Sequence, residues 1–148
     1  MSNLFTFHND ITILTHSAFN KILQKEFNLQ LANMDLIILF NLEKTNNTSM
    51  SKIMQMPLYS RHRNMTYNAR KLRKLNLILL SQDPNCKRNS IVSLSDLGKD
   101  VVECLNAFMR EIPFPQPSNL HTYSHDDSLQ DFTATLEKRV RKFKFIKE

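Results

Sequence analysis

Apolar residues recur at helical spacing along most of the chain. Over residues 11–23 and 36–42 they fall every three to four positions, which predicts a first helix ending near Phe27 and a second beginning near Asn33. Asn33 is placed to cap the second helix, because short polar side chains accept hydrogen bonds from the free N–H groups of a first turn. The polar stretch Glu43–Thr48 that follows predicts a turn.

The next segment predicts two more helices. Ser49 is a good capping residue and Pro57 cannot supply an interior helix hydrogen bond, so a short third helix fits between them. A fourth helix is predicted from about Ser60 to Leu75. Its buried stripe consists of Met65, Ala69 and Leu72. Its opposite face presents Arg63, Tyr67, Arg70 and Lys74, flanked by Asn64 and Lys71.

After this helix the apolar spacing changes from about four residues to two. Residues 77–80 alternate, Asp83–Asn85 has the composition of a turn, and residues 91–94 resume an extended run. This pattern predicts a β-hairpin, with Lys87 and Arg88 near its tip.

Two amphipathic helices close the chain. One runs from about Ser95 to Phe108, and prolines end it; residues 113–127 then form an extended, Pro-containing connector. The last helix is predicted from Ser128 to about Lys147, and its apolar stripe is buried only if it packs on another element. That stripe consists of Leu129, Phe132, Leu136, Val140 and Phe143.

Charge is distributed unevenly along the 148 residues. Ten basic residues and a single acid, Asp83, lie between Lys44 and Arg88, whereas the whole chain carries a net charge of only +6. The rest of the chain is therefore net acidic. A solvated surface usually mixes both signs, so this one-sign block favours a polyanionic partner over a merely soluble basic face.

Several classes of protein are disfavoured. The longest apolar run, Leu36–Phe40, is too short to cross a bilayer or to form the core of a signal peptide, so we expect a cytoplasmic protein with no membrane partner. Two cysteines, Cys86 and Cys104, do not make a disulfide scaffold. The single glycine, Gly98, disfavours a phosphate-cradling loop, and we expect no enzyme activity and no cofactor.

Two short helices, a tight turn and a hairpin are the outline of a winged helix-turn-helix. In this region the sequence resembles the MarR-type transcriptional regulators. The segment Cys86–Gly98 (CKRNSIVSLSDLG) is similar to the family's wing signature, and Leu72–Ile78 (LRKLNLI) is similar to its Leu-Glu-x-x-Gly-Leu-Ile. The resemblance covers about residues 31–105. The expected fold class is mainly α with a small β-hairpin wing, flanked by N- and C-terminal dimerisation helices.

Three positions depart from the family pattern. Asn76 replaces the usual Gly after the recognition helix, and asparagine tolerates the left-handed conformation that this turn needs. Met54 replaces a small Ala, so the packing of the third and fourth helices is expected to be looser or wider. Cys86 replaces an Asp that braces the wing arginine, which leaves the orientation of Arg88 open.

The candidate DNA-binding residues lie on the fourth helix and the wing. They are Ser60, Arg61, Arg63, Asn64, Thr66, Tyr67, Arg70, Lys71, Lys87 and Arg88. Arg63 and Asn64 are the best candidates for base contact, because Arg suits guanine and Asn suits adenine. Arg70 and Lys71 are expected to hold phosphates, and Lys87 and Arg88 to reach the backbone or a narrow minor groove. The competing interpretation is a solvated helix face.

Other features carry weaker alternatives. Cys86 is a redox sensor or a tolerated substitution, and Cys104 is a core residue. His121 and His125 have metal-ligand chemistry but lie in the connector, so no metal is expected. The basic last helix could instead bind an anionic membrane surface, although a dimer interface explains its apolar stripe better.

The predicted function is sequence-specific binding of double-stranded DNA by a homodimer. The resemblance implies a transcriptional regulator, more often a repressor than an activator, on a palindromic operator, with an unidentified small-molecule effector or none. The expected organisation is a dimerisation helix (1–30), a DNA-binding domain (31–95), a linking helix (96–112), a connector (113–127) and a second dimerisation helix (128–148). The alternative is a winged helix that sequesters another regulator without binding DNA.

Overall fold

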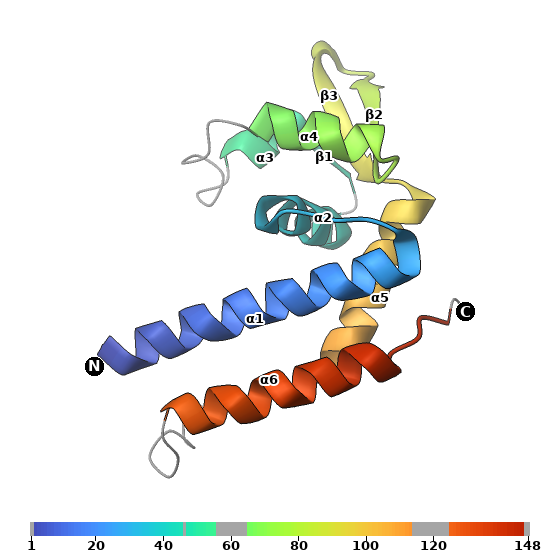
Figure 1. Ribbon diagram of the computed structural model, residues 1–148. Helices are drawn as coiled ribbons and strands as arrows, with labels where there is room; N and C mark the ends of the chain where they lie inside the picture. Colours follow the sequence, from blue (N-terminus) through green and yellow to red (C-terminus); the bar gives the residue numbers. More distant parts are fainter. Residues whose placement is uncertain (1, 46, 56–64, 114–124, 147–148) are drawn as a thin grey trace. The chain divides into compact units, whose positions relative to one another are not determined.

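The computed structural model describes residues 2–45, 47–55, 65–113 and 125–146, and it is mainly helical with one small antiparallel sheet, as predicted (Figure 1). The elements in order are α1 (Ser2–Phe27), α2 (Asn33–Thr45), β1 (Asn47–Ser49), α3 (Met50–Gln55), α4 (Met65–Lys74), β2 (Ile78–Asp83), β3 (Cys86–Leu94), α5 (Asp96–Arg110) and α6 (His125–Lys142). They form two compact units, one of residues 31–103 and one of residues 1–30 with 104–148.

The sheet of the 31–103 unit has the order β1-β3-β2. The predicted hairpin is confirmed: β2 and β3 pair with Leu80 opposite Val92, and the turn is closed by the Asn85 N–H, which donates to Asp83 Oδ1 at 2.9 Å. This side-chain acceptor is what makes Asp a good turn residue here.

The turn predicted at residues 43–48 is wrong at both ends. Helix α2 continues to Thr45, whose hydroxyl donates to the Asn41 carbonyl at 3.0 Å. Strand β1, which was not predicted, then pairs Thr48 with Val92. Its three residues, Asn-Thr-Ser, have no apolar alternation, so the strand depends on pairing with β3 and not on a local pattern.

A single apolar core joins the helices and sheet of this unit. Leu39 and Leu42 of α2, Leu72 of α4 and Val92 of β3 are all buried almost completely, as is Leu77 just before β2. The short helix α3 starts as predicted, because the Lys52 N–H donates to Ser49 Oγ at 3.2 Å. This arrangement holds α4 on α2 and leads directly into the hairpin.

The other unit is built around α1 and α6, which lie side by side (Figure 1). The ring of Phe108, from α5, has its centroid 6.2 Å from that of Phe19 and 5.3 Å from that of Phe143, in edge-to-face geometry. Of the predicted stripe of α6, Phe132, Leu136 and Phe143 are buried. These three residues are thus covered within one chain, whereas Leu129 and Val140 of the same stripe are half-buried.

The bounds of α6 differ from those predicted at both ends. The helix begins at His125, so the last residues of the predicted connector, 125–127, are helical. It ends at Lys142, not near Lys147, because Lys25 Nζ donates to the Phe143 carbonyl at 2.5 Å and Glu26 accepts the Phe145 N–H at 3.4 Å. These contacts satisfy the terminal backbone groups in a non-helical segment.

Candidate nucleic-acid interface

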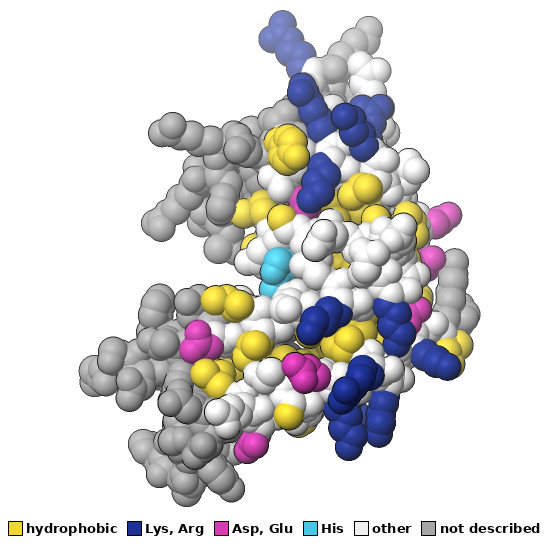
Figure 2. Space-filling view, viewed as in Figure 1, with side chains coloured by type: hydrophobic (Ala, Val, Ile, Leu, Met, Phe, Trp, Pro, Cys, Tyr) yellow, Lys and Arg dark blue, Asp and Glu magenta, His cyan; other side chains and the backbone are white. Residues whose placement is uncertain are grey.

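Helix α4 separates a buried face from an exposed basic face, as its spacing predicts. Ala69 and Leu72 are 5% and 0% exposed, whereas Tyr67 is 68% exposed. Arg70, Arg73 and Lys74 are also exposed. Figure 2 shows Lys and Arg side chains gathered over the part of the 31–103 unit that contains α4 and the hairpin. The helix carries no acidic residue, so this face has one sign of charge.

A left-handed residue ends α4 and directs the chain into the hairpin. Asn76 has a φ of 61°, which confirms the predicted turn, and the Leu77 N–H donates to the Leu72 carbonyl at 2.9 Å. Ser95 then ties this turn to α5: its hydroxyl donates to the Asn76 carbonyl and accepts the Gly98 N–H at 2.9 Å. Helix α4, the hairpin and α5 therefore meet at one hydrogen-bonded junction.

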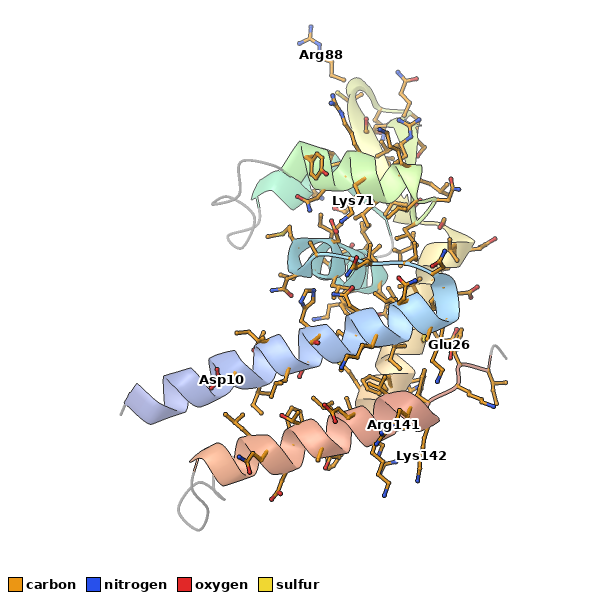
Figure 3. The ribbon with its side chains drawn as sticks, in the orientation of Figure 1. Asp10, Glu26, Lys71, Arg88, Arg141 and Lys142 are labelled. Atoms are coloured by element: carbon orange, nitrogen blue, oxygen red, sulfur yellow. The ribbon has the colours of Figure 1, made fainter. Side chains whose placement is uncertain are left out.

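The least expected feature is a buried carboxylate under α4. Asp35, in the first turn of α2, is 0% exposed. Its Oδ1 accepts a hydrogen bond from Asn68 Nδ2 at 2.7 Å, and its Oδ2 accepts from Lys71 Nζ at 2.7 Å and from the Ala32 N–H at 2.9 Å. The start of α2 is thus held by Asp35, two residues after the predicted cap Asn33. We call Asp35, Asn68 and Lys71 the α2–α4 clamp; Lys71 is labelled in Figure 3.

Sequence reasoning missed Asp35 and placed Lys71 among the phosphate contacts. A signal was present, because an acid at the third position of a helix commonly accepts the N–H of the residue before the helix, as one half of a capping box. Nothing in the local pattern showed that the same carboxylate would meet α4.

The wing contributes Arg88. This residue lies on β3 close to the hairpin turn, and its exposed side chain extends away from the strand (Figure 3). Lys87 is its neighbour on β3, but its side chain lies outside the described part of the chain, as does that of Thr66 on α4. Ser60, Arg61, Arg63 and Asn64 also lie outside the described residues, so their roles stay predictions.

The two cysteines occupy opposite environments. Cys86 is exposed at the start of β3. Cys104 is buried, and burial, with a smaller effect from the Glu26 carboxylate, raises the pKa of its thiol to about 12. Cys104 therefore stays protonated at neutral pH and packs as a core residue, as predicted. A redox role for Cys86 stays a prediction.

The described residues hold no group of three or more His, Cys, Asp or Glu side chains that could bind a metal ion. His121, and the side chains of His125, Asp126 and Asp127, lie outside that part of the chain. No described helix is long and apolar enough to cross a membrane.

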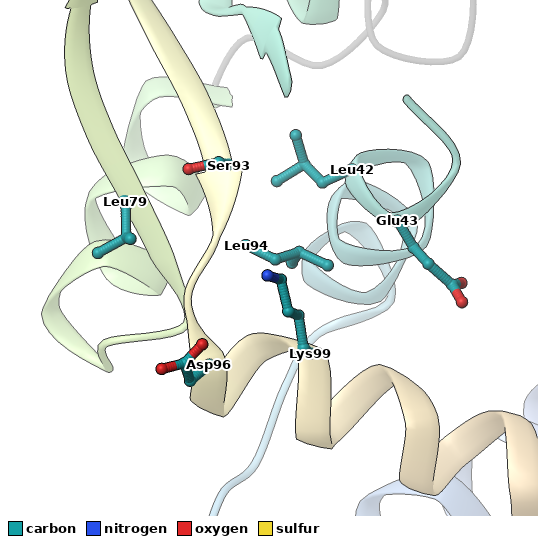
Figure 4. Close-up of a pocket in the computed structure, with 7 residues that line it drawn as sticks. All are labelled: Leu42, Glu43, Leu79, Ser93, Leu94, Asp96 and Lys99. Carbon is teal, nitrogen blue, oxygen red and sulfur yellow. The ribbon is translucent and has the colours of Figure 1, made fainter. Parts of the chain in front are cut away.

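A pocket of about 640 Å³ lies beside the sheet of the 31–103 unit (Figure 4). Its described lining consists of Leu42, Glu43, Leu79, Ser93, Leu94, Asp96 and Lys99. Three leucines supply an apolar wall, but two carboxylates stand against a single ammonium group, and none of these residues is aromatic. The described lining therefore combines an apolar wall with a net negative charge.

Comparison with known proteins identifies the fold. No family model matches the sequence, and no curated protein matches it. Among solved structures, a MarR-like transcription regulator from Bacillus cereus ATCC 10987 is 17% identical, with a TM-score of 0.56 over 91% of this chain and 94% of that one. AbsC, a MarR family regulator from Streptomyces coelicolor, is 20% identical, with a TM-score of 0.55 over 91% and 92%. Overoxidized AbfR bound to DNA is 17% identical, with a TM-score of 0.57 over 86% and 90%. The chain therefore has the winged helix fold of MarR-type regulators.

Proposed function

We propose that this chain is a sequence-specific DNA-binding transcriptional regulator and not an enzyme. The observation that carries the proposal is the exposed face of α4, where Tyr67, Arg70 and Lys74 project opposite a buried stripe and no acid dilutes the charge. AbfR, which has the same fold, has been solved on DNA. A basic helix followed by a basic wing is the arrangement by which such folds enter the major groove and hold the adjacent backbone.

The proposed contacts divide into those that select bases and those that position the protein. Arg63 and Asn64 read base edges, because a guanidinium fits guanine and an amide fits adenine. Arg70 and Lys74 neutralise phosphates beside the groove. Arg88 reaches the backbone or the narrow minor groove from the wing, where the negative potential attracts arginine.

We also propose that the regulator is a homodimer, with α1, α5 and α6 as its dimerisation helices. Two-fold symmetry would then require a palindromic operator with half-sites roughly 10 bp apart, one turn of DNA. We propose that it acts as a repressor, by occupying such a site over a bacterial promoter and blocking transcription. Sedimentation at micromolar concentration tests this, and a purely monomeric species would contradict it.

Selection of bound fragments from genomic DNA tests the proposed function. The wild type should enrich one palindromic motif, Arg63→Ala should lose it, and Arg88→Ala should weaken it. Lys44→Ala is the control, because Lys44 is an exposed cation at the end of α2 and belongs neither to the proposed DNA contacts nor to the proposed dimerisation helices. No enriched motif, together with co-purification of another regulator, would instead support a protein-sequestering winged helix.

A further inference from the structure

Asp35 is a charged group without access to water. Its side chain is 0% exposed, and both carboxylate oxygens are occupied by the three donors of Ala32, Asn68 and Lys71. Burying a carboxylate is costly unless it is paired and hydrogen-bonded, so these partners are required where the charge is present. A larger apolar residue would fill the site without that requirement. The acid therefore has a role that packing alone does not explain.

That role follows from which elements supply the donors. Asn68 and Lys71 are three residues apart, so they lie on neighbouring sides of α4, while the Ala32 N–H belongs to the start of α2. The Ala32 N–H fixes the Asp35 carboxylate at the start of α2, and the two α4 donors on that fixed carboxylate resist both sliding and rotation of α4. Arg70 is two residues from Asn68, about 200° around the helix, so it points away from the clamp. Fixing the buried side therefore fixes the direction of the exposed side.

The same geometry separates Lys71 from the residues of α4 that are proposed to contact DNA. Its Nζ lies 2.7 Å from Asp35 Oδ2, and its side chain is only 32% exposed. Reaching a phosphate would break the ion pair and leave the buried carboxylate without its only cation among the described contacts. Arg70 and Lys74 on the exposed face have no such competing role in the described contacts.

We propose that Asp35 is a positioning residue that sets the rotation of α4 and hence which side chains meet DNA, and that Lys71 pairs with Asp35 and not with a phosphate. The proposal rests on the proposed function. It predicts that Asp35, a buried acid on the side of α4 away from DNA, is needed for the protein to discriminate between DNA sequences.

The Asp35→Asn variant distinguishes a positioning role of Asp35 from a general electrostatic effect of its charge on DNA binding. The substitution makes the protein more positive, so electrostatics alone would tighten binding to every duplex. The positioning role predicts instead that binding to the selected operator weakens about tenfold or more while binding to a scrambled duplex is unchanged or tighter, as measured by fluorescence anisotropy. Asp96→Asn is the matched control: it removes an exposed acid in the same unit and should leave the operator-to-scrambled ratio unchanged. Tighter binding to both duplexes by Asp35→Asn would overturn the proposal.

The Lys71→Met variant tests whether the Lys71 ammonium group contacts a phosphate. This test can be made even if the Asp35 variant does not fold. A phosphate contact contributes about 0.9 to the slope of log affinity against log salt concentration. Arg70→Met should therefore make the slope shallower by about that amount, whereas Lys71→Met should keep the wild-type slope and lower only the operator-to-scrambled ratio. Lys71→Arg, which keeps the charge, should restore the ratio. A shallower slope for Lys71→Met, with equal losses on both duplexes, would show a phosphate contact and overturn the proposal.

The wild-type measurement distinguishes failure of the proposed function from failure of the positioning role. If the wild type does not discriminate between the duplexes, the proposed function itself fails. If the wild type discriminates and both the Asp35→Asn and Lys71→Met variants discriminate equally well, only the positioning role fails. Circular dichroism of each variant verifies that the compared proteins are folded.

Discussion

Helices α4 and α6 look alike in sequence but are held in the molecule by different means. Both are amphipathic, and both end in cations: Lys71, Arg73 and Lys74 in α4, and Arg139, Arg141 and Lys142 in α6. Helix α4 contains no acid, whereas α6 contains Asp126, Asp127, Asp131 and Glu137. The buried face of α4 is fixed by a buried carboxylate, whereas the end of α6 is fixed where Phe143, the residue after the helix, packs on Phe108.

The difference shows that cations at the end of a helix do not identify a nucleic-acid surface. Positive charge in a last turn stabilises the negative end of any helix dipole, which accounts for both sets equally well. What distinguishes α4 is a face of one sign beside a basic hairpin. What distinguishes α6 is an apolar stripe that α1 covers within the same unit, so Phe132 and Leu136 are not free to enter a membrane surface.

Removing a buried aromatic ring from the unit that contains α6 should produce the largest loss of stability. Phe108→Ala removes a fully buried ring that contacts Phe19 and Phe143, and we expect it to lower the free energy of unfolding by about 3–5 kcal/mol. Urea unfolding followed by circular dichroism measures the loss. Ile146→Ala is the control, since that side chain is 80% exposed and should change stability by less than about 0.5 kcal/mol. Equal losses in the two variants would contradict the aromatic core described for this unit.

Removing two cations from α4, and in a separate variant two from α6, tests whether the exposed face of α4 in particular binds DNA. Arg70→Ala with Lys74→Ala should weaken operator binding about a hundredfold, because each charged contact contributes on the order of 1.4 kcal/mol, a factor of ten. Arg139→Ala with Lys142→Ala removes the same charge from α6 and should weaken binding by no more than about twofold. Anisotropy titrations at one fixed salt concentration compare the two. A large loss from the α6 pair, in a variant that sediments like the wild type, would mean that net charge, and not the α4 face, governs binding.

The sequence was sufficient to predict the two faces of α4 in its described part, because one spacing rule defines both faces. The burial of Leu72 and the exposure of Tyr67 follow from the helical period alone, and Asn76 announces its left-handed turn by residue type. Strand β1 and the clamp could not be predicted in the same way. Thr48 becomes a strand only by pairing with Val92, and Asp35 meets Lys71 only because α2 and α4 pack together across 36 positions of sequence. Those features are tertiary, and local periodicity carries no information about them.

The junction after α4 depends on a close approach between α5 and the Leu77 backbone, and Gly98 tests how much this approach matters. A Cβ at this position would press on the backbone carbonyl of Leu77, with the carbonyl carbon only 3.1 Å away and a Leu94 methyl group at 3.2 Å. Because the obstruction is mainly backbone, we expect Gly98→Ala to cost about 1–3 kcal/mol, as measured by thermal unfolding. Substituting Ala at exposed Lys99, the next residue, should cost far less. An unchanged melting temperature for Gly98→Ala would mean that α5 can shift away from β2.

The smallest expected effect compares the ends of two helices, one in each unit. Asn76 follows α4 with a φ of 61°, and Asn28 follows α1 with a φ of 55°. Glycine adopts this region without strain, so Asn76→Gly and Asn28→Gly should each change stability by less than about 1 kcal/mol, whereas alanine at either position should be destabilising by about that amount. The consequence for DNA should differ. Residue 76 joins the recognition helix to the wing through the Ser95 hydroxyl, so Asn76→Ala should also weaken operator binding, while Asn28→Ala should not. Thermal unfolding and anisotropy on the same four variants measure both quantities. Equal losses of DNA affinity from the two alanine variants would mean that stability alone, and not the geometry at the end of α4, transmits the change.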